Sequence, residues 1–282
     1  MLSRIFRLSS RVPSVHHDRA HYIAAADKTP SAVRPKTDSG YRKYTIPTTR
    51  LSESMEDNSK TPLLLVSCGS FNPITFLHLR MFEVCRDWVR SNTPHFTVCG
   101  GIISPVSNAY GKANLAPAHH RVAMAKLSTK TSSWIAVDTW ESENKEYIPT
   151  ALVLDRFANK INANSGISPN TGRKKKCKVG LIAGADLIET MSTPGVWSDE
   201  DLDHILHHYE LFIVERTGTD VRAAVAKLGE RQHSNIHIVP QPIQNDVSST
   251  KIRLFAKRGM SIRYLIPDAA VEYIEEHNLY RE

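Results

Sequence analysis

The stretch from residue 63 to residue 80, LLLVSCGSFNPITFLHLR, constrains the fold of this chain more than any other segment. Its first four residues are apolar and have the length and composition of a buried β-strand. Gly69 and Ser70 end that strand, and apolar residues recur at helical spacing from Phe76 onward. A strand, a glycine-containing turn and a helix N-terminus together gather free backbone N–H groups around one point, which suits an anion. His78, in the first turn of the helix, would direct a ring nitrogen at that anion.

Further strands are predicted at residues 96–103, 134–137, 178–182, 211–214 and 236–239, with helix-forming segments between them. This alternation predicts an α/β fold with a doubly wound, mostly parallel sheet. Such sheets bind ligands at the carboxyl ends of their strands. The segments to inspect for a binding site are therefore residues 69–78, 104–112, 138–150, 184–186 and 241–253.

The first 60 residues differ in composition from the rest of the chain. They carry 11 Lys and Arg against 6 Asp and Glu, a net charge of +5, which leaves +2 of the total +7 for residues 61–282. We therefore expect a basic, disordered arm or transit peptide at 1–60 and one folded domain at 61–282. Arginines near the start, with few acidic residues among them, are typical of a mitochondrial transit peptide. The alternative is a disordered basic arm that carries no targeting signal, on a protein of the nucleus or cytoplasm.

Composition also limits the classes of partner. Because residues 61–282 have little basic excess, we expect no nucleic acid partner. No apolar run is long enough to span a membrane, and we expect no membrane partner. The four cysteines show neither a CxxC pair nor zinc-ligand spacing, which favours free thiols. The basic run at 173–176 is more often a solvated loop than a nuclear signal. We expect the protein to form a homo-oligomer.

Three segments carry a resemblance to a known family. The string GSFNPITxxHLR at 69–80 resembles the signature of [H/T]xGH-type nucleotidylyltransferases, and among them the eukaryotic nicotinamide/nicotinate mononucleotide adenylyltransferases. SSTKIR at 248–253 resembles the triphosphate segment of that family, and SPVSNAYGK at 104–112 resembles its SPVGDAYKK loop. The resemblance covers roughly residues 62–281, apart from the loop at 159–178. It implies a Rossmann-like nucleotidylyltransferase fold and the synthesis of NAD⁺ and pyrophosphate from ATP and nicotinamide mononucleotide, with nicotinate mononucleotide as a second acceptor.

The resemblance also implies roles for individual residues on the ATP side. His78, Lys251 and Arg253 would stabilise the triphosphate, and the guanidinium of Arg253 can span two phosphate oxygens. Taken alone, the SSTK sequence is an ordinary helix N-cap. The other ATP and phosphate contacts implied by the family are Gly69, Ser70, Phe71, Gly184, Asp186, Asn245, Ser248, Ser249 and Thr250.

The pyridine mononucleotide is implied to contact Lys112, Tyr147, Thr150, Val196 and Trp197. An aromatic face suits an electron-poor pyridinium ring, because stacking and cation–π attraction act together. Tyr147 stands where the family has a tryptophan, so the preference between nicotinamide and nicotinate stays open. A second departure is Gln241, where relatives tend to have a glutamate near the adenosine.

The chemistry requires positioning and charge neutralisation, because a nucleotide phosphate is already an ionised nucleophile. Mg²⁺ would arrive bound with ATP, since the sequence has no cluster of carboxylates for it. Two other functions stay open. One is adenylyl transfer to another acceptor, such as a phosphopantetheine. The second is a non-catalytic chaperone or nucleotide-binding adaptor that has kept the fold.

Overall fold

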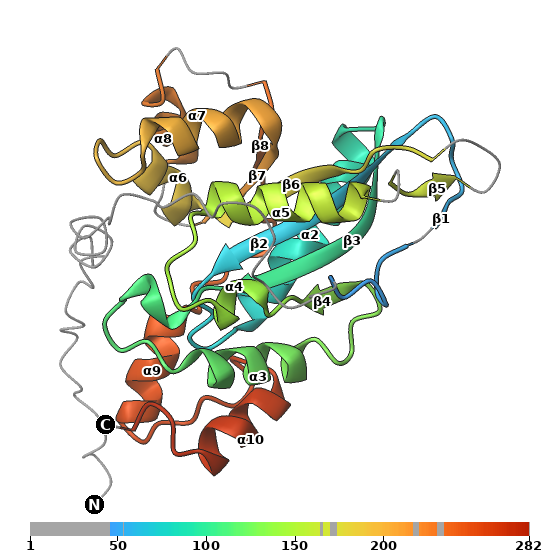
Figure 1. The fold of residues 1–282 in the computed structure, drawn as a ribbon. Coiled ribbons are helices and arrows are strands. Elements are labelled where there is room, and N and C mark those ends of the chain that lie inside the picture. The colour runs from blue at the N-terminus through green and yellow to red at the C-terminus, as the bar shows by residue number, and fades with distance from the viewer. Residues whose placement is uncertain are drawn as a thin grey trace, which may run out of the picture.

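The computed structural model describes residues 46–52, 54–163, 166–169, 174–216, 220–229 and 234–281. Its centre is a six-stranded sheet in which every strand pair is parallel, with the order β4-β3-β2-β6-β7-β8. The strands are β2 (Thr61–Gly69), β3 (Phe96–Pro105), β4 (Ile135–Val137), β6 (Lys178–Gly184), β7 (Glu210–Val214) and β8 (Ile236–Val239). The predicted α/β fold with a parallel sheet is confirmed (Figure 1).

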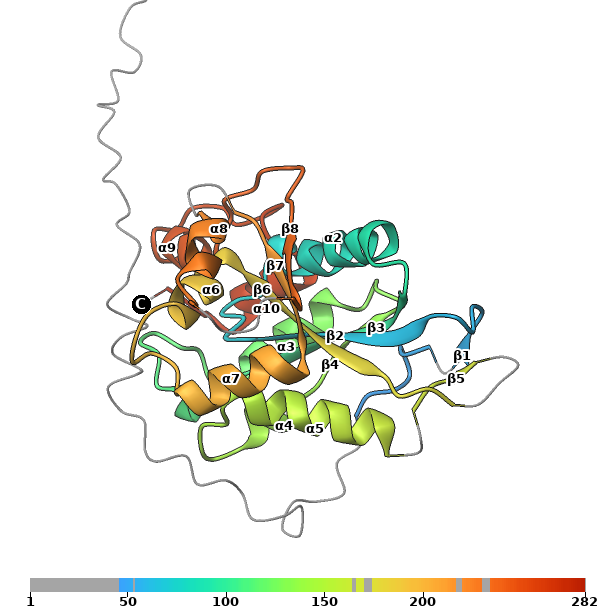
Figure 2. The ribbon, with the colours of Figure 1, turned by 90° about the horizontal axis from the view of Figure 1, so that it is seen from above.

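Helices cover both faces of this sheet. They are α2 (Phe76–Asn92), α3 (Ala118–Ser128), α4 (Trp140–Glu143), α5 (Thr150–Asn162), α6 (Ala185–Met191), α7 (Asp199–His208), α8 (Val221–Ala226), α9 (Ser249–Lys257) and α10 (Asp268–Glu276). Figure 2 shows α2 on one side of the sheet and α5 and α7 on the other. A short 3₁₀ helix, η1 (Asn108–Tyr110), follows β3.

The apolar run of β2 supplies two cores at once. Leu63 and Leu65 belong to the core beneath α2, α3 and α10, whereas Leu64 and Val66 belong to the core beneath α5 to α8. All four side chains are fully buried. Successive residues of a strand point to opposite faces, so a continuous apolar run is what a central strand covered on both faces requires.

The strand order reverses direction beside β2. From β2 the chain adds β3 and β4 on one side, and then returns to place β6, β7 and β8 on the other. The loops that leave β2 and β6 therefore diverge, and this opens a crevice at the carboxyl ends of the two strands. The glycines that end these strands, Gly69 and Gly184, lie at that crevice.

The folded region begins earlier than residue 61. Ile46, Leu51 and Met55 are buried in the core. The strand β1 (Ser54–Met55) pairs with β5 (Ser168–Pro169). Arg50 donates hydrogen bonds of 2.7 and 2.6 Å to the carbonyls of Thr129 and Ile135. The predicted boundary is therefore too late, because a few anchoring side chains fix a segment whose composition is polar. Residues 1–45, where most of the predicted arm lies, are outside the described residues.

Three smaller expectations concern the cysteines, membrane spans and the basic run at 173–176. All four cysteines are free, as predicted. In the part of the chain that the structure describes, no helix has both the length and the hydropathy needed to cross a bilayer. Of the basic run at 173–176, Lys175 donates a hydrogen bond of 2.9 Å to the carbonyl of Lys60, and Arg173 lies outside the described residues.

Candidate active site

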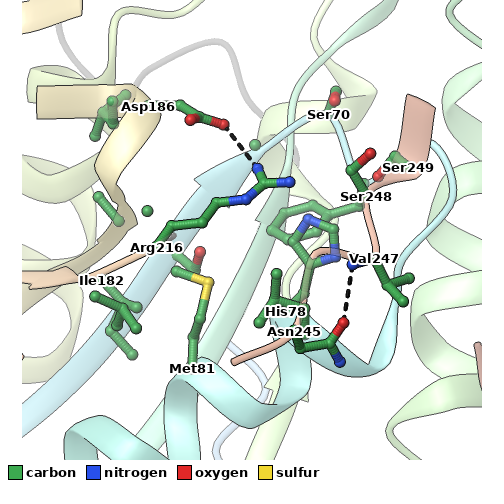
Figure 3. Close-up of a pocket in the computed structure, with 18 of the residues that line it drawn as sticks. Ser70, His78, Met81, Ile182, Asp186, Arg216, Asn245, Val247, Ser248 and Ser249 are labelled. Carbon is green, nitrogen blue, oxygen red and sulfur yellow. Dashed lines mark hydrogen bonds and ion pairs between the residues drawn. The ribbon is translucent and has the colours of Figure 1, made fainter. Parts of the chain in front are cut away.

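A cavity of about 420 Å³ lies at the carboxyl ends of β2, β6 and β7, where the N-termini of α2 and α9 also point. Most of the residues predicted for ATP binding line it. They are Gly69, Ser70, Phe71, His78, Gly184, Asp186, Asn245, Ser248, Ser249, Thr250 and Arg253, and Lys112 from the acceptor set joins them. Segments far apart in sequence therefore meet in one space (Figure 3).

The first turn of α2 fixes the imidazole of His78. Thr75 is the N-cap, and its backbone N–H donates a hydrogen bond of 3.0 Å to Nδ1 of His78. A backbone N–H can only donate, so Nδ1 carries no proton and Nε2 carries it in the neutral ring. Phe71 packs edge-on against the ring, with centroids 5.3 Å apart. His78 therefore faces the cavity as a neutral donor of fixed orientation.

Burial keeps this imidazole neutral. It lowers the pKa of His78 to about 4, and the positive charge of Arg216 acts in the same direction. At neutral pH the ring therefore presents one N–H donor and no charge. Such a donor suits a phosphate oxygen whose negative charge increases during the reaction.

The N-terminal turn of α9 is docked onto the loop that follows β2. Ser248 is the N-cap, and its Oγ accepts a hydrogen bond of 3.2 Å from the backbone N–H of Lys251. Ser249 donates a hydrogen bond of 2.8 Å to the carbonyl of Pro73. Arg253 donates one of 2.8 Å to the carbonyl of Asn72. The helix N-terminus and the guanidinium therefore face the same anion site as His78.

Lys251 is not part of this arrangement. Its ammonium forms an ion pair with the carboxylate of Asp246, and this hydrogen bond lowers the pKa of that carboxyl. Lys251 is absent from the cavity lining, whereas Arg253, two residues later, belongs to it. Residues two positions apart on a helix lie on different faces, and of these two cations only Arg253 lines the cavity.

Arg216 is a cavity residue that the sequence analysis missed. It follows β7, and its Nη1 lies 3.2 Å from Oδ2 of Asp186. Figure 3 shows its side chain reaching across the cavity between Asp186 and His78. The other oxygen of Asp186, Oδ1, is buried and has no hydrogen-bond partner among the described residues. Its position in the sequence could have indicated a place in the site, because Arg216 closely follows a predicted strand, and ligands bind at the carboxyl ends of such strands.

Gln241 also lines the cavity, at the position where the family tends to have a glutamate. Its Oε1 is buried and has no hydrogen-bond partner in the described structure. Asn245 lies nearby on the same connection and accepts a hydrogen bond of 2.8 Å from the backbone N–H of Val247. The amide of Gln241 therefore offers a buried acceptor to a ligand with a donor group.

The residues predicted for the pyridine ring do not line this cavity. Tyr147 stacks on Tyr110, with ring centroids 5.8 Å apart and planes 30° apart. Trp197 packs partly buried against the core, and its indole N–H donates a hydrogen bond of 3.1 Å to Oγ1 of Thr190. Thr150 begins α5, and Val196 lies in the turn before Trp197. Of the acceptor set, only Lys112 reaches the cavity wall.

A buried carboxyl lies behind the acceptor loop. Ser104, at the end of β3, donates a hydrogen bond of 2.5 Å to Oε2 of Glu141. Burial raises the pKa of Glu141 to about 8, and the negative charge of Asp138 acts in the same direction. Burial raises the pKa of Tyr110, and the negative charge of Glu141 is the second cause of this rise. The two groups are therefore close. At neutral pH most Glu141 side chains are protonated and uncharged.

No dedicated metal cage is present among the described residues, where no group of three or more His, Cys, Asp or Glu side chains is arranged to hold an ion. The acidic side chains of the cavity are Asp186 and Glu215, and Asp186 is already paired with Arg216. This donor set does not suit a fully protein-ligated ion. It is compatible with Mg²⁺ held by phosphates and water, the coordination this cation commonly adopts.

Comparison with known proteins shows which family this chain resembles. A family model described as cytidylyltransferase-like matches residues 66–255. The chain is 50% identical over 241 residues to nicotinamide/nicotinic acid mononucleotide adenylyltransferase 2 of Saccharomyces cerevisiae, covering 84% of this chain and 61% of that protein. It is 43% identical over 257 residues to nicotinamide/nicotinic acid mononucleotide adenylyltransferase 1 of Bos taurus, covering 80% of this chain and 91% of that protein.

The fold also matches a solved structure, Plasmodium falciparum nicotinic acid mononucleotide adenylyltransferase complexed with NaAD. The TM-score is 0.56 at 20% identity, over 78% of this chain and 97% of that chain, and this likeness concerns the fold alone. The chain spans less than two thirds of the length of the yeast relative, but nearly all of the bovine one. By its sequence, the chain belongs to the nicotinamide/nicotinic acid mononucleotide adenylyltransferase family.

Proposed function

We propose that this protein transfers the adenylyl group of ATP to nicotinamide mononucleotide, giving NAD⁺ and pyrophosphate, and that it accepts nicotinate mononucleotide as well. The observation that carries this proposal is the meeting of His78 and Arg253 in one cavity, at the N-termini of α2 and α9. The names of the yeast and bovine relatives, which include both acceptors, support it.

The reaction follows from this arrangement. A phosphate oxygen of the mononucleotide attacks the α-phosphorus of ATP and forms the new P–O bond, while the bond from the α-phosphorus to the bridging oxygen breaks. The electron pair of that bond leaves with pyrophosphate. No proton has to be removed from the nucleophile, because the phosphate is ionised. The protein therefore contributes orientation and charge neutralisation, and no covalent intermediate is formed.

Each cavity group has a role in this step. His78 donates its Nε2 proton as a hydrogen bond to the triphosphate, and Arg253 holds two phosphate oxygens with its fixed charge. The backbone of residues 69–71 adds N–H donors. Asp186, with its unpartnered oxygen Oδ1, accepts a hydrogen bond from a ribose hydroxyl of ATP. Arg216, paired with Asp186, adds positive charge beside the phosphates.

We propose that the acceptor binds next to this cavity, against the SPVSNAYGK loop. Lys112 would contact the phosphate of the mononucleotide, and the pyridine ring would lie near Tyr147 and Trp197. Mg²⁺ would enter with ATP and neutralise part of the triphosphate charge. Residues of this chain would contact that ion through the phosphates and water.

The test is dinucleotide and pyrophosphate release from ATP and Mg²⁺, measured separately with each pyridine mononucleotide. We expect turnover with both, and a loss of at least about 10²-fold in kcat for His78→Ala and for Arg253→Ala. If the folded wild type binds ATP but makes no dinucleotide with either acceptor, the proposal is wrong. Turnover with a phosphopantetheine instead would point to another acceptor class. Suppression of aggregation that survives His78→Ala would point to a chaperone.

We also propose that the N-terminal segment directs the protein to mitochondria, on the strength of its arginines and its scarcity of acidic residues. The test is the location of a fluorescent protein fused to residues 1–45, with Arg4, Arg7 and Arg11 changed to Glu as the control. Mitochondrial signal that the control loses supports the proposal. Nuclear or cytoplasmic signal from both fusions contradicts it. The expected homo-oligomer stays a prediction, to be tested by light scattering.

A further inference from the structure

The chain returns to the phosphate loop at its C-terminus. After α10 the backbone enters the left-handed region at Asn278 (φ 50°) and again at Tyr280 (φ 63°). The backbone N–H of Leu279 bonds to the carbonyl of Ile274 at 3.0 Å, which closes the helix end as a Schellman turn. A tyrosine with positive φ is uncommon and costs free energy, so contacts elsewhere must hold it there.

Those contacts are made by the hydroxyl of Tyr280, which donates a hydrogen bond of 2.7 Å to Oδ1 of Asn72. Asn72 is 2% exposed and lies within the loop that follows β2. The same side chain accepts a bond of 3.2 Å from the backbone N–H of Ala116 and donates one of 2.8 Å to the carbonyl of Asn114. Asn72 therefore joins the loop that follows β2, the segment at 114–116 and the C-terminal segment.

Arg253 depends on this junction. Its Nη1 donates a hydrogen bond of 2.8 Å to the main-chain carbonyl of Asn72, the residue that Tyr280 holds by its side chain. Burial raises the pKa of the Tyr280 hydroxyl, and the positive charges of Arg253 and Arg121, which lie close to it, act in the opposite direction. The burial effect is larger, so the phenol stays protonated and can donate. Tyr280 does not line the cavity, so any effect of Tyr280 on bound ATP is exerted through Asn72.

We propose that Tyr280 is a positioning residue for adenylyl transfer, which fixes Asn72 so that the carbonyl of Asn72 orients the guanidinium of Arg253 toward the triphosphate. This inference rests on the proposed function. The bidentate contact of an arginine with phosphate depends on the orientation of its planar group, and small errors in position reduce the rate more than they reduce binding. Removal of the Tyr280 hydroxyl is therefore expected to lower kcat and to leave the KM for ATP unchanged.

The experiment compares Tyr280→Phe with Tyr273→Phe in the full chain. The control removes the same hydroxyl from the neighbouring helix α10, where Tyr273 bonds to Nδ1 of His120 at 3.0 Å and does not line the cavity. We expect Tyr280→Phe to lower kcat about tenfold with the KM for ATP within twofold, and Tyr273→Phe to leave both unchanged. The melting temperatures of the two variants should agree, because each loses one half-buried hydroxyl.

A double-variant cycle separates positioning from a general structural effect. In an Arg253→Ala background we expect Tyr280→Phe to cause no further loss, because the group it positions is gone. With an active wild type, two results would overturn the inference. One is that the losses in kcat from Tyr280→Phe and Arg253→Ala multiply in the double variant. The other is that Tyr280→Phe has the same kcat as Tyr273→Phe. A wild type that makes no dinucleotide overturns the proposed function itself, and this role with it.

Discussion

Oδ2 of Asp186 and Nη1 of Arg216 lie 3.2 Å apart in the lining of the cavity, just after the ends of two neighbouring strands, β6 and β7. This pair fixes the cation that faces His78, and its charge contributes to the low pKa of the imidazole. The site therefore combines fixed positive charges with one neutral donor. Protonation of His78 would place a second positive charge beside Arg216 in a buried site. Burial and charge repulsion both disfavour that charged form.

The protonation of His78 gives the first prediction. In the ligand-free protein at pH 7, nitrogen NMR should show Nδ1 without a proton and Nε2 with one, because the backbone N–H of Thr75 occupies Nδ1. No titration of His78 is expected between pH 8 and pH 5, since burial lowers its pKa to about 4. The His78→Ala spectrum identifies the resonance. A midpoint near 6.5 would contradict this account.

The same pKa has a consequence for stability. Between pH 6.5 and about 4 the unfolded chain protonates His78 while the folded protein does not. The contribution of this group to the free energy of unfolding is therefore full above pH 6.5 and decreases as the pH falls toward 4. Removing the imidazole should make acid unfolding less steep over this interval.

Lys251 and Arg253, both in α9, give the second prediction. Arg253→Ala should reduce kcat about 10²- to 10³-fold, because Arg253 lines the cavity and bonds to the loop beside it. Lys251→Ala should reduce it less than about tenfold, since its ammonium is paired with Asp246 at a half-exposed position. Arg258→Ala, an exposed charge at the end of the same helix, is the control for net charge. Equal losses for Lys251 and Arg253 would contradict the structure.

Sequence was sufficient for the architecture because the determining signals are local. The run of apolar residues at 63–66 predicts a strand covered on both faces, and the glycine turn before His78 predicts the anion site. The six strands of the sheet and the start of α2 were predicted to within a few residues. What local signals could not supply was the short strand β1, whose two residues are fixed by pairing with β5 more than a hundred positions later.

The candidate site was predictable where a motif stands at a strand end or a helix N-terminus. Lys251 lies outside the cavity lining, and this could not be predicted because its position depends on the rotation of α9, which sequence spacing alone does not fix. Arg216 was missed because it belongs to no motif, and its role arises from its contact with Asp186 in the first turn of α6. Tyr280 gave no signal at all, since its contact with Asn72 joins residues 208 positions apart.

The third prediction concerns the buried carboxyl of Glu141. Burial raises its pKa from 4.5 to about 8, so between these values the folded protein holds a proton that the unfolded chain has lost. The contribution of this group to stability is therefore full below pH 4.5 and decreases as the pH rises toward 8, by about 1.4 kcal/mol per pH unit. Glu141→Gln removes the ionisation and keeps the size of the side chain.

We therefore expect the free energy of unfolding of Glu141→Gln, measured relative to wild type in urea, to increase from pH 5 to pH 8. The matched control is Glu143→Gln, an exposed carboxyl on the same short helix that bonds to Thr139 at 2.7 Å. Its difference from wild type should be small and nearly constant. A difference for Glu141→Gln that does not change with pH would refute the buried, protonated state.

The last prediction concerns Arg121, which is fully buried and donates to three main-chain carbonyls. Its Nε, Nη1 and Nη2 bond to Ala116, Ser70 and Val106 at 2.8, 2.9 and 2.7 Å, and these carbonyls belong to the two loops that border the site. Burial lowers the pKa of the guanidinium to about 10, so it is still a cation at pH 7. One rigid fork thus holds both loops.

Arg121→Leu leaves three carbonyls without their donor, and we expect it to lower the free energy of unfolding by about 3–5 kcal/mol in urea denaturation. Arg121→Lys should recover only part of this, because one ammonium on a flexible stem cannot reach three divergent oxygens. Arg90→Leu, an exposed arginine on α2, should change stability by less than about 0.5 kcal/mol. A lysine variant as stable as wild type would show that charge, and not the geometry of the fork, holds the two loops together.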